Sequence, residues 1–432
     1  MSPKPPVAPS LPRTSPVLAL TLLAAISTCG FIDRIIMNVL VQPIKMEFGL
    51  TDMQIGLVGG LAFAALNVLL GIWVARYAER GRRVTLVTVG TLLWSLATAA
   101  CGGVATFTGL VLARVGVGVG EAVGLPATSS LVSDMFPPEK RGRAISVLLL
   151  APPVGAFLGS AGASIVAEAY GWRAAFWLAA APGLLLAILF WLFVREPRRG
   201  TFDKLGDRAG DVPPLSAVIH RIVSRHSLRN LLLGSTIAST VGFGANAFLA
   251  AYLMRRFGYG LAEAGVLAGL IASVPATTSV LGSGWLADRL GSVNGKWYGY
   301  IPAFSLLVSA PLYVGAVMAP SAPMAIALFA LAAIFQYTYL APTATVFQNM
   351  MHPRMRASST AVVSLVYSLV GAGLGPLLVG GLSDALAPDA SAAGSATGLG
   401  RALAIVALGY LWAGVHYWLA TRRIRAELAL PL

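Results

Sequence analysis

Twelve long apolar runs, separated by shorter polar segments, are the main pattern in this chain of 432 residues. A bilayer core of about 30 Å requires roughly 20 mainly apolar residues in a helix, and each run has about that length. The pattern predicts an all-α integral membrane protein with twelve transmembrane helices. The predicted spans are 17–44, 52–78, 84–103, 107–134, 143–168, 172–194, 228–254, 261–289, 296–318, 323–350, 358–384 and 400–420.

One long polar segment divides these runs into six and six. We therefore expect two six-helix bundles and three polar regions. The predicted organisation is a disordered cytoplasmic tail at 1–16, bundles at 17–194 and 228–420, a cytoplasmic linker at 195–227 and a cytoplasmic C-terminal tail at 421–432.

The two sets of six runs match at corresponding places. The acidic residues Glu79 and Asp288, after the second and eighth runs, are 209 positions apart, and Arg143 and Arg356 are 213 apart. Such a constant offset indicates a duplicated six-helix unit. An even number of spans separates equivalent loops, so both halves have the same orientation, related by an axis along the membrane normal. We expect a substrate site near the midplane, where two such bundles meet.

Glycines also recur at equivalent positions. Gly155 and Gly159 lie in the fifth run, and Gly371 and Gly375 lie in the eleventh. Small residues let membrane helices approach closely, so these two runs are predicted to be matched, closely packed helices.

The positions of the Lys and Arg residues explain the net charge of +14 by membrane topology. If the N-terminus is cytoplasmic, 24 of the 31 Lys and Arg residues lie on the cytoplasmic side, five lie outside and two lie within spans. This is the positive-inside bias, and it indicates attraction to anionic lipid and no nucleic-acid partner. We expect a multi-pass protein of a bacterial inner membrane with both termini in the cytoplasm.

Residues suited to metal binding or covalent catalysis are few and scattered. Cys29 and Cys101 both lie within apolar spans, which favours neither a disulfide framework nor a metal site. The histidines are far apart in the chain, so no catalytic cluster is indicated; they are His220, His226, His352 and His416. We expect no metal, no cofactor and no enzymatic activity.

Four charged residues lie deep in predicted spans: Asp33 and Arg34 in the first, Arg114 and Glu121 in the fourth. Each costs between about 2.5 and more than 10 kcal/mol in hydrocarbon. A rise of about 1.5 Å per residue places Asp33 and Arg114 at similar depths, which predicts that they pair if the helices are adjacent. The four charges sum to zero, so they could also be a purely structural cluster that joins the two helices.

Intramembrane ionisable residues usually mark an ion or substrate pathway. If an anionic substrate takes the arginine partner of a carboxylate, that carboxylate takes up a proton, and substrate and proton movements become coupled. Asp33 is our first choice for the proton site and Glu121 the second. Arg34 and Arg114 are the predicted anion contacts, Arg34 above all.

The second half carries neutral polar residues in its spans. Of these we expect Asn246, Gln336, Tyr337 and Tyr367 to contribute to substrate binding. A weakly polar wall suits an amphiphile with a charged head better than a sugar, which needs many directional hydrogen bonds. Charged residues at cytoplasmic helix ends are predicted to form contacts in one conformational state and release them in another; they are Glu79, Arg80, Arg83, Asp134, Arg141, Asp288 and Arg289.

Three stretches carry a family resemblance: Phe31-Ile32-Asp33-Arg34, Arg114 through Ala122, and Gly284-Trp285-Leu286-Ala287-Asp288-Arg289-Leu290-Gly291. With them the chain resembles the major facilitator superfamily, and most closely its spinster-like lipid-transporter branch. The resemblance implies functional roles for the acid and arginine of the first span and the arginine and glutamate of the fourth. Animal members export sphingosine phosphate or lysophospholipids, with proton coupling proposed.

The sequence thus predicts a proton-coupled secondary active transporter that works by alternating access. The expected substrate is an anionic amphiphile such as a lysophospholipid or a sphingoid phosphate-like lipid, moved by a monomer. The alternative is a symporter or antiporter of a small organic anion or drug-like compound. Organic-anion symporters of the same superfamily also carry an Asp-Arg pair in the first span.

Overall fold

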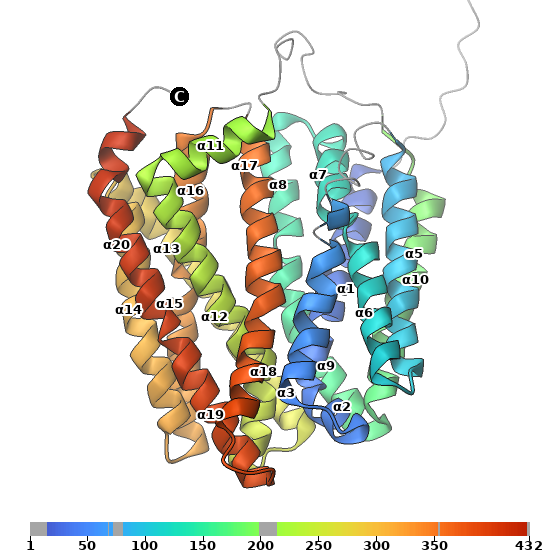
Figure 1. Cartoon of the computed structure of the whole chain (residues 1–432). Coiled ribbons are helices and arrows are strands. Elements are labelled where there is room, and N and C mark those ends of the chain that lie inside the picture. The colour runs from blue at the N-terminus through green and yellow to red at the C-terminus, as the bar shows by residue number, and fades with distance from the viewer. Residues whose placement is uncertain (1–14, 68, 72–80, 198–213, 353–354, 430–432) are drawn as a thin grey trace, which may run out of the picture.

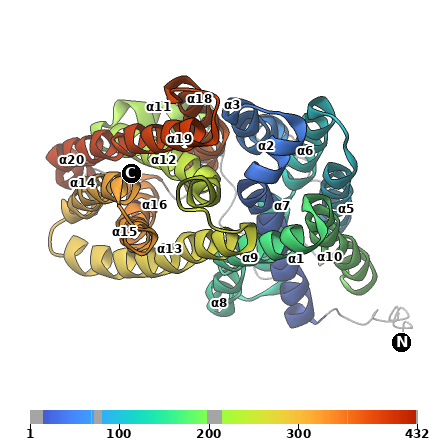
Figure 2. The same ribbon diagram turned by 90° about the horizontal axis from the view of Figure 1, so that it is seen from below.

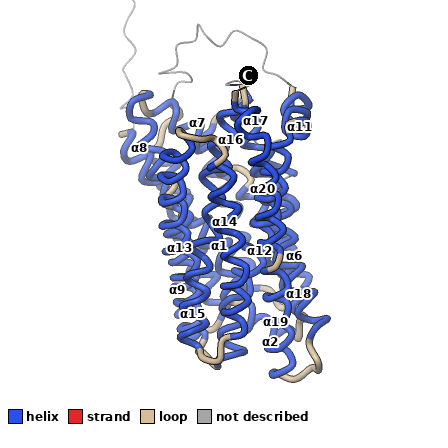
Figure 3. Tube along the Cα trace, turned by 90° about the vertical axis from the view of Figure 1, so that its left-hand side faces the viewer, coloured by secondary structure: helices blue, strands red, loops and turns tan. Residues whose placement is uncertain are grey.

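The computed structural model describes residues 15–67, 69–71, 81–197, 214–352 and 355–429. In this described part every regular element is a helix, as Figure 3 shows. Eleven described helices are long and apolar enough to cross a membrane. The remaining predicted span, 107–134, folds as two consecutive helices separated by Ala122 and Val123, so neither reaches that length alone. The predicted all-helical fold is confirmed.

The helices of the first half are α1 (Pro16–Val39), α2 (Val41–Phe48), α3 (Asp52–Gly56), the π-helix η1 (Leu57–Leu61), α5 (Arg83–Gly103), α6 (Phe107–Glu121), α7 (Gly124–Met135), α8 (Pro138–Leu148), α9 (Ala151–Tyr170) and α10 (Trp172–Phe193). Those of the second half are α11 (Leu215–Ser224), α12 (His226–Phe257), α13 (Leu261–Gly291), α14 (Trp297–Met318), α15 (Ala322–Gln336), the 3-10 helix η3 (Tyr337–Tyr339), α16 (Leu340–Met350), α17 (Arg356–Val366), the π-helix η5 (Tyr367–Leu374), α18 (Gly375–Leu386), α19 (Ala392–Ala407) and α20 (Gly409–Leu428).

The two halves form two bundles that lie side by side, the first blue to green and the second yellow-green to red in Figure 1. The end view in Figure 2 shows where they meet: α9 lies beside α13, and α3 beside α18. We call the end of the molecule that carries Asp52 and Arg255 the latch end, and the opposite end, which carries Glu196 and His226, the linker end.

Backbones of the two halves approach closely where these helices cross. A Cβ atom added at Gly60 would lie 2.6 Å from the carbonyl oxygen of Gly373, and one at Gly56 would collide with the carbonyl of Pro376. Only glycine fits at such distances. The two π-helices, η1 and η5, also contact each other at this crossing. π-helices are rare in proteins, and those that occur are often at functional sites. Their pairing across the halves therefore makes this interface a candidate functional region.

Matched glycines give the two halves the same internal packing. Gly155 lies against Thr28 and Phe31 of α1, the first helix of its half, where an added Cβ would be 2.5 Å from Phe31 Cβ. Gly375 lies against Thr240 of α12, the first long helix of the other half, at an equivalent 2.5 Å from its carbonyl oxygen. The close packing expected from the sequence is therefore present in both bundles.

Two boundaries differ from those predicted. The predicted linker contains the helix α11, whose buried Val218 and Ile222 pack on the second half, and α12 begins at His226. The last helix, α20, continues to Leu428, past the predicted end of the final span at 420. Both segments are amphipathic, and a length criterion for apolar runs does not detect such helices.

Candidate functional site

The four intramembrane charges lie together between α1 and α6. Asp33 and Arg114 are each only 1% exposed and Glu121 is 6% exposed. The side chain of Arg34 is different, because 39% of it is exposed. The cluster thus has three buried members and one that remains accessible. We refer to Asp33, Arg34, Arg114 and Glu121 as the charged cluster.

The ion pair in the charged cluster is Arg34–Glu121, with 2.5 Å between Arg34 Nε and Glu121 Oε2. The predicted Asp33–Arg114 ion pair is wrong: Arg114 Nη1 donates instead to the main-chain carbonyl of Asp33, at 3.0 Å. The cause is helix direction. Side chains tilt toward the N-terminus of their own helix, and α1 and α6 run in opposite directions, so Arg34 and Glu121 lean toward each other.

Several polar atoms of the charged cluster have no hydrogen-bond partner among the described residues. They are Oδ1 of Asp33, Oε1 of Glu121, and Nε and Nη2 of Arg114. An unsatisfied buried polar group costs roughly 1–3 kcal/mol, and this cost is highest where charge is involved. Such atoms are available to a proton or a ligand, which a fully satisfied structural cluster would not offer.

Phe63, beyond η1 in the second span, lies between the two arginines. The guanidinium of Arg34 is 5.2 Å from the centre of its ring and that of Arg114 is 5.4 Å away, both within cation–π range. Gly118 permits this, because a side chain there would collide with the carbonyl of Phe63. Sequence reasoning missed Phe63, since a lone phenylalanine in an apolar run carries no signal.

The expected polar residues of the second half form contacts among themselves. Asn246 Nδ2 donates to the hydroxyl of Tyr337 at 2.9 Å, which joins α12 to η3. The hydroxyl of Tyr313 donates to the buried Gln336. Tyr367 is at the start of η5 and takes part in neither of these hydrogen bonds. In the described part of the chain, no hydrogen bond or ion pair connects these residues to the charged cluster.

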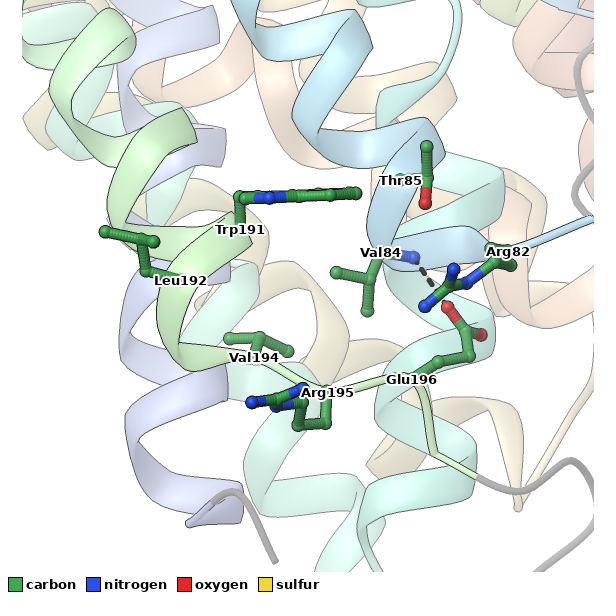
Figure 4. A pocket seen from close by; sticks show the side chains of 8 residues that line it. All are labelled: Arg82, Val84, Thr85, Trp191, Leu192, Val194, Arg195 and Glu196. Atoms are coloured by element: carbon green, nitrogen blue, oxygen red, sulfur yellow. Dashed lines mark hydrogen bonds between the residues drawn. The ribbon is translucent and has the colours of Figure 1, made fainter. Parts of the chain in front are cut away.

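Arg83 is the best-anchored of the predicted gating residues. Its side chain is fully buried at the linker end and forms ion pairs with Asp134 and Glu196, the latter at 2.8 Å. The same Glu196 accepts a 2.8 Å hydrogen bond from the backbone N–H of Val84 at the start of α5, as Figure 4 shows. The end of α10 is thereby fixed to α5 and α7. Arg141 donates to the carbonyl of Ser133 at 2.7 Å.

The other predicted gating residues contribute less to this end. Asp288 and Arg289 are exposed in the last turn of α13, where the Arg289 guanidinium lies 5.4 Å from the ring centre of Trp285. Glu79 and Arg80 lie outside the described residues. The structure also has no group of three or more His, Cys, Asp or Glu side chains, within its described residues, that could hold a metal ion.

Asp52 is the centre of a second polar cluster, at the latch end, which sequence reasoning did not single out. Its carboxylate accepts from Arg255 Nη1 and Nη2 at 2.7 and 2.8 Å, from Lys45 at 2.6 Å and from the Ser383 hydroxyl at 2.6 Å. Arg255 and Ser383 belong to the second half. We call the set Lys45, Asp52, Arg255 and Ser383 the Asp52 latch.

A further carboxylate strengthens the same junction. Both oxygens of Asp384 accept from backbone N–H groups at the start of α3, those of Asp52 at 2.9 Å and Met53 at 2.8 Å. Negative charge is favourable at a helix N-terminus. The sequence carried one signal for this junction, namely charged residues near the predicted outer loops.

Comparison with known proteins agrees with the fold. The family model of the Major Facilitator Superfamily matches residues 22–376. This chain belongs to that superfamily. It is 32% identical over 411 residues to an MFS-type efflux pump of Mycolicibacterium smegmatis, covering 95% of this chain and 94% of the relative.

The resemblance to the spinster branch is confirmed. The chain is 27% identical over 398 residues to human protein spinster homolog 1, covering 85% of this chain and 73% of the relative. It also matches the crystal structure of a bacterial homolog of the human lysosomal transporter Spinster, in an inward-facing and unoccupied conformation, with a TM-score of 0.89 and 28% identity over 96% of this chain and 99% of that one. This member of the superfamily is therefore a spinster-like, multi-pass transporter.

Proposed function

We propose that this transporter couples the movement of protons to that of an anionic amphiphile, a lysophospholipid or sphingoid phosphate-like lipid. The observation that carries the proposal is the Arg34–Glu121 ion pair, in which the cation is 39% exposed and the carboxylate only 3%. An anion can reach the guanidinium without entering the protein interior, whereas the buried Glu121 then loses the one ion pair that it forms with a described residue.

The coupling follows from the cost of an unpaired buried charge. An anion that binds Arg34 competes with Glu121, and a buried carboxylate left without its cation is neutralised most readily by a proton. Asp33 lies within electrostatic range of both Glu121 and Arg114 but forms no ion pair with a described residue. We assign Asp33 as the proton carrier, and Glu121 as the group through which anion binding is transmitted to it.

Alternating access would proceed by movement of one bundle against the other around this site. The contacts between the halves gather at the latch end, at the Asp52 latch and along the glycine crossings. We place the linker end in the cytoplasm of a bacterium, because the positive-inside bias favours that side. The closed latch end then corresponds to an inward-facing state, the state of the homologous crystal structure.

The apolar character of the second half supports an amphiphile. Four of its polar residues hydrogen-bond in two pairs, Asn246 with Tyr337 and Tyr313 with Gln336, so few donors are left to surround a sugar. The similarity to an efflux pump favours a second candidate, a smaller organic anion or drug-like compound. Both candidates use Arg34 as the anion contact, and they differ only in the apolar part of the substrate.

The test is transport in liposomes loaded with a pH-sensitive dye. A panel of lysophospholipids, sphingoid phosphates and small carboxylates is offered to the parent, to Asp33→Asn and to Glu121→Gln, with Asp389→Asn, an exposed loop residue, as the matched control. We expect substrate-dependent proton flux in the parent and control, and uncoupled or absent flux in the two cluster variants. Substrate movement without proton flux in the parent would refute the coupling.

A further inference from the structure

Two of the cationic side chains at the latch end form no ion pair with a described residue. Five Lys and Arg residues lie at this end. Lys45 and Arg255 pair with Asp52, and Arg173 pairs with Glu47 at 2.7 Å. The remaining two, Arg256 and Arg401, form an ion pair with no carboxylate of the described residues.

Both of these arginines line the same cavity. It has a volume of about 490 Å³ and lies where α12, α14 and α19 meet, with Arg255, Arg256 and Arg401 in its wall. Sites for small molecules usually measure roughly 300–1,000 Å³. Two arginines without an ion-pair partner on a cavity of this size favour the binding of an anion.

The cavity has an apolar side as well as a charged one. The short residues Ala393, Ala396 and Gly400 of α19, together with Val317 of α14, form that side. A Cβ at Gly400 would be in ordinary contact with Tyr252 and Val317, 3.5 Å from each, so the glycine leaves that space to the cavity. A free ion needs no such surface, whereas the glycerol and acyl part of a lipid does.

Two hydrogen bonds hold the wall in place. The hydroxyl of Tyr252 donates to the carbonyl of Val317 at 2.8 Å, which ties α12 to α14. Nη1 of Arg401 donates to the carbonyl of Leu386 at the end of α18, at 3.2 Å. One hydrogen bond from its own Nη1 thus orients the Arg401 side chain, and its other N–H groups can donate to a ligand.

We propose that this cavity binds a phosphate-type headgroup between Arg256 and Arg401, and that its occupant competes with Asp52 for Arg255. Arginine is suited to this because its planar fork of donors matches phosphate oxygens. The preferred source of the headgroup is an anionic lipid at the latch end, since the apolar side accommodates its chains. The site is separate from the charged cluster and goes beyond the proposed transport function.

An anion in the cavity that competes with Asp52 for Arg255 would affect whether the latch end is closed or open. Arg255 donates from Nε to Gln42 at 2.8 Å and from both Nη atoms to Asp52, so these side-chain hydrogen bonds are all with the first half. Its side chain nevertheless lines the cavity. An anion bound beside it weakens the attraction to Asp52, and the latch end opens more readily.

Binding is tested on the purified full chain in detergent, without transport, by titration with dioctanoyl phosphatidic acid and, separately, dioctanoyl phosphatidylcholine. We expect Kd for phosphatidic acid to rise at least tenfold in Arg256→Gln/Arg401→Gln and to stay unchanged in Arg422→Gln/Arg423→Gln, a matched pair of exposed arginines on α20. Arg256→Lys, which keeps the charge, should bind better than Arg256→Gln. Equal Kd values in the parent and in the first double variant would overturn the proposal, provided circular dichroism shows the variant folded.

Inorganic phosphate distinguishes the two sources of the headgroup. If millimolar phosphate displaces phosphatidic acid, the site recognises the phosphate group alone; if it does not, the lipid chains are required. Either result supports a phosphate-type site. Equal affinity for phosphatidic acid and phosphatidylcholine would contradict it, because the second headgroup carries no net charge.

Competition with Asp52 is tested by spin-label distances across the latch end, between Met46→Cys on α2 and Met318→Cys at the end of α14, both exposed, in a background that lacks Cys29 and Cys101. Phosphatidic acid should shift the distance distribution toward longer values in the parent and not in Arg256→Gln/Arg401→Gln. An unchanged distribution in the parent, at saturating lipid, would overturn the competition.

Discussion

The guanidinium of Arg255 and the carboxylate of Asp52 form two parallel hydrogen bonds, at 2.7 and 2.8 Å, across the junction between the halves. The side chains are 5% and 1% exposed. Paired geometry of this kind is the strongest form of the arginine–carboxylate interaction. Because α3 and α12 belong to different bundles, this pair has to separate whenever the latch end opens.

Neutralising Asp52 should therefore favour opening of the latch end. Breaking one partner of a buried ion pair costs about 3–5 kcal/mol, and here the cost falls on the closed state alone. In Asp52→Asn, we expect the population with a wide Met46–Met318 spin-label distance to rise more than tenfold. Glu47→Gln, which breaks a half-exposed pair at the same end, is the control. A closed population equal to that of the parent would contradict the role of the latch.

The charged cluster should show its strongest coupling where the structure shows an ion pair. Arg34→Gln and Glu121→Gln each leave a charge unpaired, so their combined loss of thermal stability should be smaller than the sum of the two single losses. Asp33→Asn and Arg114→Gln should be closer to additive, because Arg114 donates to the main-chain carbonyl of Asp33 and forms no ion pair with its carboxylate. Melting temperatures of the purified variants test both cycles, and additivity in the first would argue against the Arg34–Glu121 pair.

Gly380 and Gly381 provide a matched test of the close approach between α18 and α3. A Cβ at Gly380 would lie 2.6 Å from the carbonyl carbon of Asp52, whereas one at Gly381 would lie 3.9 Å from the flexible side chain of Met53. We expect Gly380→Ala to hold the latch end open and to lower the transport rate at least tenfold, and Gly381→Ala to resemble the parent. Equal transport by the two variants would show that this crossing does not need to close.

Arg83 should be important for stability at the linker end. Removing its guanidinium takes away the ion pairs of Arg83 with Asp134 and Glu196, in a network where the Arg83 side chain is fully shielded from solvent. We expect Arg83→Gln to lose about 3–5 kcal/mol of stability, and Arg82→Gln, its exposed neighbour, to lose less than about 0.5 kcal/mol. Thermal unfolding of the two variants side by side provides the comparison, and similar melting temperatures would be inconsistent with the buried network.

The ionisation of Glu47 should make the stability of the protein depend slightly on pH. The indole N–H of Trp172, and then Arg173, hold the pKa of Glu47 below its ordinary value of 4.5. A lowered folded-state pKa contributes stability above pH 4.5 that is lost as the pH falls below it. Between pH 6 and pH 3 the parent should lose slightly more thermal stability than Glu47→Gln, and a parallel loss in both would exclude this contribution.

Most of the architecture was predictable because it depends on local properties of the chain. The length of each apolar run fixed the helices, and the constant offsets between Glu79 and Asp288 and between Arg143 and Arg356 indicated the duplication. The four members of the charged cluster were also predictable, since a charge in an apolar run is conspicuous. Their positions along two helices were sufficient to place them at similar depths.

The partners of these residues were decided only by the tertiary structure. Arg34 pairs with Glu121 because antiparallel helices direct those two side chains toward each other, and depth alone cannot distinguish this from a pair between Asp33 and Arg114. Phe63 enters the cluster because Gly118 lets the second span approach. Asp52 and Arg255 are 203 positions apart, so their contact depends on how one bundle packs on the other, which no local pattern records.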